Sequence, residues 1–179
     1  MTTIAMISGH VDLSKEDFDK FYLPKLKELI KDDVICFVLG GALGTDKLAQ
    51  EFLSSQNDNM NLIVMVYDKQ DQNNVCYPNI KHVNGFTSYT VRDEVMTSES
   101  TLDVCFVRRK GGIGSGTFQN VVRRKLGSKT ASLLTKMIRS QPNSLTITIE
   151  NVKELLMTKL GEETAKIIIN LAEEVACIE

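Results

Sequence analysis

The chain has few of the residues that bind metals, cross-link secreted domains or break helices. Its 179 residues include four cysteines, two histidines, three prolines and no tryptophan. The cysteines at positions 36, 76, 105 and 177 are widely separated and form no C-x-x-C pair, so we expect no metal site. Cys36 and Cys105 lie in apolar runs and are expected to be buried thiols in a reducing environment.

The chain also lacks a long apolar run and an excess of positive charge. No run is apolar enough to span a bilayer, and no signal-peptide pattern follows Met1, so we expect a cytoplasmic protein without a membrane partner. The net charge is −2, and the basic clusters at 108–110 and 123–125 have no interleaved aromatic residues. Nucleic acid is therefore not the expected partner.

Apolar runs alternate with helical patterns along the first part of the chain. This alternation predicts an α/β fold, with a doubly wound, mainly parallel, Rossmann-like sheet. Pro24 lies inside the first helical pattern and predicts a kink or break there. The expected strands cover 3–7, 34–41, 61–68 and 102–109, and helices are expected near 14–31, 44–55, 89–100 and 117–125.

The pattern changes near residue 127. We expect a Rossmann-like nucleotide-binding domain over 1–127 and a C-terminal helical extension over 128–179. The extension shows a helix at 128–140, a short β-like alternation at 144–149 and two amphipathic helices hinged at Gly161. The apolar faces of these helices are explained equally well by packing within the subunit and by a homo-oligomer.

A long polar connection covers residues 69–88 and shows neither a helical nor a strand period. Connections of this length are often functional. Tyr77, His82 and Phe86 can stack on a base if the connection is a lid, or they can anchor a surface insertion to the core.

Three glycine-bearing turns follow expected strands: "SGH" at 8–10, "GGALGTD" at 40–46 and "GGIGSGT" at 111–117. In doubly wound sheets, ligands bind beyond the carboxyl ends of the strands. The third turn precedes a helix, whose free N–H groups attract an anion, and it is the expected phosphate-binding loop. The residues expected to bind ligand are Ser8, Gly9, His10, Gly40, Gly41, Gly44, Asp46, Arg92, Gly112, Gly114, Ser115, Gly116, Thr117 and Asn120.

With these turns in place, residues 3–126 resemble the SLOG superfamily, which joins the DNA-processing protein A domain and the lonely-guy phosphoribohydrolases. "GGALGTDKLAQEF" is similar to its uncharacterised YspA-like branch. "VRDEVM", followed by "LDVCFVRRKGGIGSGTFQN", resembles the lonely-guy arrangement, in which Arg92 and Met96 fall on the pattern. The resemblance implies a nucleotide-binding domain with no additional cofactor.

The chain departs from the lonely-guy pattern at the acid. In that family, a glutamate after the glycine loop acts with the arginine to cleave the base–ribose bond. Here Phe118, Gln119 and Asn120 follow Thr117, and Asp93 replaces the usual lysine after Arg92. An amide cannot transfer a proton at neutral pH, so the pattern favours binding over hydrolysis.

Two main functions follow. The first is binding of a nucleotide or nucleotide-derived small molecule, with Arg92 neutralising its phosphate. The alternative is a nucleotide N-glycosidase in which Arg92 acts with a displaced carboxylate, Asp46 or Glu94. Structural roles remain open beside these: Asp46 as a helix N-terminal partner, Arg92 as a surface i,i+4 partner and His10 as a turn residue. A DNA-binding domain is a third, less favoured hypothesis.

Overall fold

The computed structural model describes residues 3–31, 36–56, 62–68 and 80–178. Contacts divide the chain into two compact units, Met1–Cys105 and Phe106–Glu179, called here the first and second unit. This division lies upstream of the boundary between 127 and 128 that the sequence indicates. The segment α5 (Gly116–Arg139) consists of two helices that meet at a kink at Gly127, so the chain does change there. The unit boundary lies earlier because α5 packs against the turn before it, Gly112–Gly114, and against α7 (Glu162–Val175).

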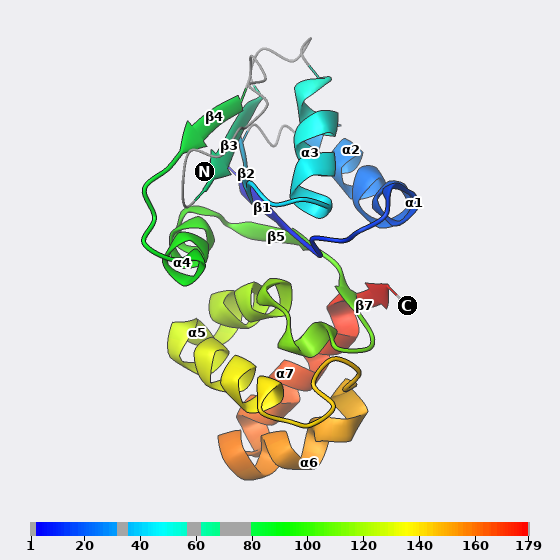
Figure 1. The fold of residues 1–179 in the computed structure, drawn as a ribbon, viewed down its shortest axis with the longest axis vertical. Helices are drawn as coiled ribbons and strands as arrows, with labels where there is room; N and C mark the ends of the chain where they lie inside the picture. The colour runs from blue at the N-terminus through cyan, green and yellow to red at the C-terminus, as the bar shows by residue number, and fades with distance from the viewer. Residues whose placement is uncertain (1–2, 32–35, 57–61, 69–79, 179) are drawn as a thin grey trace. The chain divides into compact units, whose positions relative to one another are not determined.

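The first unit contains a five-stranded, all-parallel sheet in the order β4-β3-β2-β1-β5 (Figure 1). The α/β, Rossmann-like fold expected from the sequence is confirmed. Its strands are β1 (Ile4–Ser8), β2 (Cys36–Gly40), β3 (Ile63–Tyr67), β4 (Ile80–Val83) and β5 (Leu102–Cys105).

Helices cover both faces of this sheet. The chain moves outward from β1 to β4 and then returns to the other side of β1, so right-handed crossovers place the helix before β5 on the opposite face from the earlier helices (Figure 1). Helix α2 (Leu23–Lys31) and helix α3 (Thr45–Ser54) cover one face, and helix α4 (Tyr89–Glu99) covers the other.

Pro24 does not break the first helical segment. The short α1 (Lys15–Asp17) leads into a π-helical turn, Phe18–Tyr22, and α2 follows without interruption. The N–H of Leu23 bonds to the carbonyl of Phe18, five residues earlier. A widened turn directly before a proline accommodates its missing N–H and its bulky ring, so the irregularity that the proline predicts takes the form of a π-turn.

Alternate residues of each strand point to opposite faces and build two apolar layers. Met6, Val38 and Tyr67 form one buried cluster with Met96 of α4. Phe86 packs against this cluster, and the centroid of its ring lies 5.7 Å from that of the Tyr67 ring. Of the two roles expected for the aromatic residues of 69–88, Phe86 therefore has the anchoring one. Tyr77 lies outside the described residues.

One expected strand is too long, and one strand was not expected. The run 102–109 is not one strand, because β5 ends at Cys105, where its partner β1 ends at Ser8. Val107–Arg108 form a separate strand, β6, in the second unit. Within the connection 69–88, residues 80–83 form the edge strand β4, which pairs with β3 from Val64 to Tyr67.

The second unit is mainly helical. Strand β6 pairs in parallel with β7 (Ala176–Ile178), and α5, α6 (Ile149–Leu160) and α7 form the remainder. The expected hinge at Gly161 is confirmed, with φ of 84° between α6 and α7. The β-like alternation at 144–149 does not form a strand; it turns into α6, whose N-terminus is capped by Thr148 and Asn151.

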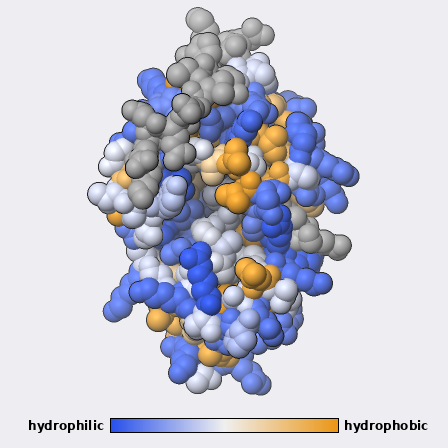
Figure 2. Space-filling model, in the orientation of Figure 1, coloured by the Kyte–Doolittle hydropathy of each residue, from blue (hydrophilic) through white to orange (hydrophobic). Residues whose placement is uncertain are grey.

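The face shown in Figure 2 is largely hydrophilic, with several small apolar patches between the hydrophilic residues. In the first unit, the exposed large apolar residues include Val11 and Leu43, in the turns after β1 and β2. No helix in the described ranges is both long and apolar enough to cross a membrane.

Substitution of Gly44, which precedes α3, can show how tightly the turns after β1 and β2 are packed. The φ of Gly44 is 65°, and a Cβ there would lie 2.4 Å from the carbonyl oxygen of His10. Gly85 has a φ of 95°, but a Cβ there would meet nothing within 4 Å. We expect Gly85→Ala to destabilise the first unit by about 1 kcal/mol through backbone strain alone. Gly44→Ala should destabilise it by at least about 2 kcal/mol, because backbone atoms must also move.

Tyrosine fluorescence during urea unfolding measures this difference, because all four tyrosines lie within residues 22–89. Equal losses in the two variants would contradict the tight packing of the Gly44 turn.

Candidate functional site

The strand order identifies the part of the first unit at which a doubly wound sheet would bind a ligand. The chain reverses its winding direction beside β1, between β1 and β5, and ligands of doubly wound sheets bind beyond the carboxyl ends at such a point. Ser8 ends β1 and Gly40 ends β2. The register that pairs Ile7 with Leu39 puts Ser8 beside Gly40, with their side-chain positions on the face that α4 covers.

Two of the side chains expected to bind ligand, those of Asp46 and Arg92, approach the backbone of Gly40. A Cβ at Gly40 would lie 2.5 Å from Oδ2 of Asp46 and 3.0 Å from Nη1 of Arg92. At the next position, a Cβ on Gly41 would lie 2.3 Å from Oδ2 of Asp68. The glycine pair after β2 therefore makes room for the chain's own charged groups.

Arg92 is held in place by two neighbours on α4. Its Nε and Nη2 atoms donate to Oδ1 of Asp93 at 2.9 and 2.7 Å, and both side chains are mostly buried. The ring of Tyr89 lies over the guanidinium, with 5.0 Å between Cζ and the ring centroid. Asp93 thus balances the charge of Arg92, while Nη1 faces Gly40.

Asp46 is a buried acid with an unusual pKa. Burial raises the pKa of Asp46 from its ordinary value of 3.8 to about 7. The positive charge of Arg92 and a hydrogen bond from the N–H of Ala42 to Oδ2, at 3.2 Å, lower it in part, whereas Asp93 and Asp68 raise it. Asp46 therefore gains and loses its proton near neutrality, as a general acid or base must. It also lies in the first turn of α3, the structural position expected for it.

The hydroxyl of Ser8 has no hydrogen-bond partner among the described residues, although Ser8 is only 8% exposed. Buried polar atoms are nearly always paired, so an unpaired one indicates a group that a ligand or water satisfies. The carbonyl of Ser8 is already engaged, because it accepts a bond of 2.9 Å from the hydroxyl of Tyr22.

Two other residues of the first unit that were expected to bind ligand, Gly9 and His10, take part in packing and backbone hydrogen bonding. A Cβ at Gly9 would collide with the hydroxyls of Thr45 and Tyr22, at 2.2 and 2.4 Å. The carbonyl of His10 accepts bonds from the N–H and the hydroxyl of Thr45, at 3.1 and 3.2 Å. These contacts fix the turn after β1 against the start of α3. Glu94 makes no hydrogen bond or ion pair with any described residue, whereas Asp46 approaches the same glycine as Arg92 and has its pKa lowered in part by that charge.

The glycine loop belongs to the second unit, and much of it bonds to itself. The N–H of Gly111 donates to Ile147 at 2.8 Å, and those of Gly114 and Ser115 donate to Gly111 and Gly112. Ser115 caps α5 by accepting the N–H of Phe118 at 3.1 Å. These N–H groups already have acceptors within the chain.

Packing explains further residues of the loop. A Cβ at Gly114 would lie 3.1 Å from Ile138, and the buried side chain of Asn120 accepts a hydrogen bond from Arg123. The N–H groups of Gly116 and Thr117 lie in the first turn of α5, where the helix itself offers no acceptor. N–H groups at such a helix start are suited to an anion.

Sequence reasoning gave no role to Tyr89 and did not pair Asp93 with Arg92. The spacing of Tyr89 and Arg92, three residues apart on one helix, is the signal that predicts their contact. Among the residues that the structure describes, no group of three or more His, Cys, Asp or Glu is arranged to hold a metal ion.

No protein-family model, curated protein or solved structure matches the chain. The resemblance to the SLOG superfamily therefore stays a prediction, and the functional argument rests on the geometry of the site.

The pKa of Asp46 predicts how stability depends on pH. Between about pH 4 and pH 7 the native state keeps a proton on Asp46 that the unfolded chain has lost, so the free energy of unfolding falls as the pH rises and levels off above pH 7. Asp46→Asn removes this contribution. We compare the free energy of unfolding of the wild type with that of the variant at each pH. The difference, wild type minus variant, should fall by on the order of 4 kcal/mol between about pH 4 and pH 7.

Urea unfolding followed by tyrosine fluorescence at several pH values measures this difference. Parallel pH profiles for the two proteins would show that Asp46 titrates normally.

Proposed function

We propose that the chain binds a nucleotide or nucleotide-derived small molecule at the carboxyl edge of the sheet. The observation that carries the proposal is the unpaired, buried hydroxyl of Ser8 beside Gly40, to which the side chains of Asp46 and Arg92 both come close. An unsatisfied polar atom next to fixed charges, at the point where the sheet reverses its winding, supports a ligand with polar groups of its own.

The charges favour the sugar part of such a ligand at this site. Arg92 is already paired with Asp93, and Asp68 adds a further carboxylate, so a phosphate here would meet net negative charge. Ribose hydroxyls can donate to carboxylate oxygens and accept from or donate to Ser8. The ring of Tyr89, 55% exposed and stacked on Arg92, offers a flat surface for a base. The phosphate role assigned to Arg92 from the sequence is thus the less favoured one.

The phosphate-loop hypothesis rests on the second unit alone. There the N–H groups of Gly116 and Thr117 at the start of α5 are suited to an anion, because groups in the first turn of a helix have no intrahelical acceptor and the Ser115 cap bonds to Phe118 instead.

Replacing Ser8 by alanine separates binding from folding. We expect Ser8→Ala to keep or slightly raise the free energy of unfolding, because it removes an unpaired buried hydroxyl. It should weaken the binding of a ribonucleotide about tenfold, because one ligand hydrogen bond is lost. A thermal-shift screen of nucleotides, nucleosides and ADP-ribosyl compounds finds the ligand, and titration calorimetry measures both affinities.

Ser100→Ala is the matched control. Its buried hydroxyl donates to the carbonyl of Met96 at 2.7 Å, so the variant should lose about 1 kcal/mol of stability and keep its affinity. A Ser8→Ala protein that is less stable than the wild type and binds as tightly would contradict the proposal.

A second candidate is a nucleotide N-glycosidase, favoured by the pKa of about 7 at Asp46. A carboxyl group that titrates near neutrality can protonate a leaving base or take a proton from water, and Arg92 at Gly40 can stabilise negative charge on that carboxylate. This acid comes from the second glycine turn, whereas the lonely-guy glutamate follows the third.

If the chain cleaves nucleotides, Asp46→Asn should lower the release of free base at least about 100-fold and leave binding within a few-fold. Chromatography of incubated hits measures the free base. Glu51→Gln, which removes an exposed carboxylate from the same helix, should release base at the wild-type rate. Loss of release in Glu94→Gln, with Asp46→Asn still active, would assign the chemistry to Glu94.

A further inference from the structure

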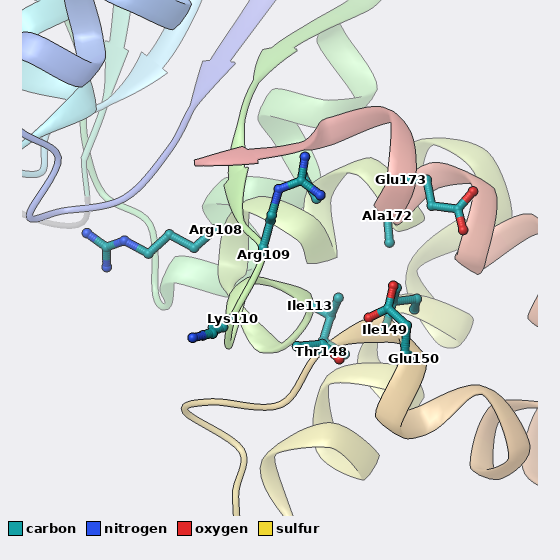
Figure 3. A pocket seen from close by; sticks show the side chains of 10 residues that line it. Arg108, Arg109, Lys110, Ile113, Thr148, Ile149, Glu150, Ala172 and Glu173 are labelled. Atoms are coloured by element: carbon teal, nitrogen blue, oxygen red, sulfur yellow. The ribbon is translucent and has the colours of Figure 1, made fainter. Parts of the chain in front are cut away.

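The second unit contains a pocket that the proposed function does not use. Its volume is about 310 Å³, at the lower end of the range in which proteins bind small molecules. Three segments line it: the stretch from the end of β6 through Ile113, the N-terminus of α6, and the last turns of α7 with the start of β7 (Figure 3). All of its lining residues belong to the second unit.

The floor of the pocket is aliphatic. Ile113, Ile149 and Ala172 line it, and each is at least nine-tenths buried. A floor of this kind gains free energy by covering hydrocarbon, and it offers no group to a sugar or phosphate. The ligand must therefore carry an apolar part.

Charges of both signs stand above this floor. Figure 3 shows the guanidinium of Arg109 on one side and the carboxylates of Glu150 and Glu173 on the other, whereas Arg108 and Lys110 extend away. Arg109 has no hydrogen-bond or ion-pair partner in the described part of the chain, so its donors are available to a ligand. The pKa of Glu150 is lowered by hydrogen bonds from its own N–H and from Thr148, which keeps this carboxylate ionised at neutral pH.

The pattern excludes a simple anion, because two carboxylate residues, Glu150 and Glu173, line the same pocket. It also excludes a simple cation, because Arg109 lies opposite. A ligand that pairs with Arg109, with the carboxylate residues and with the aliphatic floor has one negative group, one positive group and a hydrocarbon part. Among small metabolites, this combination describes the zwitterion of an α-amino acid.

We propose that this pocket binds a free α-amino acid with an aliphatic side chain. The carboxylate of the amino acid pairs with Arg109, whose planar fork suits it. The ammonium faces Glu150 and Glu173, and the side chain covers Ile113, Ile149 and Ala172.

Titration of the full-length, ¹⁵N-labelled chain with L-leucine tests the proposal. Leucine should bind saturably at millimolar concentrations or below, and should shift the amide signals of Ile113, Thr148 and Ala172. Three probes each lack one part of the ligand: isocaproate lacks the ammonium, isopentylamine lacks the carboxylate, and glycine lacks the hydrocarbon. Each should bind at least about tenfold more weakly than leucine.

Arg109→Gln should weaken leucine binding about tenfold and leave the weaker binding of isopentylamine unchanged. Arg109 is exposed, so the variant is expected to fold. Lys159→Gln makes the same change in net charge at the opposite end of α6 and should bind leucine as the wild type does.

The proposal is overturned if leucine does not saturate, if isocaproate binds as tightly as leucine, or if Lys159→Gln loses as much affinity as Arg109→Gln. Leucine-dependent shifts confined to Ser8, Gly40 and Arg92 would also overturn it, because they would place the ligand in the first unit.

Discussion

The candidate site depends on the close approach of two side chains to the backbone of Gly40. A methyl group at this position would crowd both the Asp46 carboxylate and the Arg92 guanidinium. Asp46 lies on α3 and Arg92 on α4, which cover opposite faces of the sheet, so both helices bring a charged group to the edge where the strands end. Because each helix is fixed by its own apolar layer, the two charged groups are held without a flexible loop between them.

The electrostatics of the site follow from this confinement. Burial makes ionisation of Asp46 costly, and the nearby carboxylates of Asp68 and Asp93 add to that cost. Arg92 offsets only part of it, because its guanidinium is shared with Asp93. The result is a protonatable carboxyl group beside an unpaired hydroxyl at Ser8. Such a surface is suited to hydroxyl groups that both donate and accept, which is why we assign it to sugar and not to phosphate.

The sequence predicted the strands of the sheet better than their ends, and the site residues better than their partners. Buried parallel strands are continuous apolar runs, so β1, β2 and β3 were visible directly. The end of β5 could not be predicted in this way. The strand stops at Cys105 because the neighbouring strand β1, which pairs with it, ends at Ser8. The edge strand β4 contains Lys81 and His82 and shows no apolar run. Asp46 and Arg92 were identified from turn and motif positions, but the pairing of Arg92 with Asp93 depends on side-chain rotamers that no spacing encodes.

The glycine loop shows why a motif alone is a weak guide to an anion site. Gly111 has a φ of 74°, and a Cβ there would lie 2.3 Å from the carbonyl of Leu145, so conformation and packing both require glycine. Gly114 has no positive φ, but a Cβ there would crowd the side chain of Ile138 at 3.1 Å. A loop shaped by its own neighbours and a loop shaped by a phosphate can thus share one sequence pattern. What distinguishes them is where the N–H groups point, and here several are bonded within the chain. The unpaired hydroxyl of Ser8 is the more discriminating feature, because folding alone gives a buried donor no reason to stay unpaired.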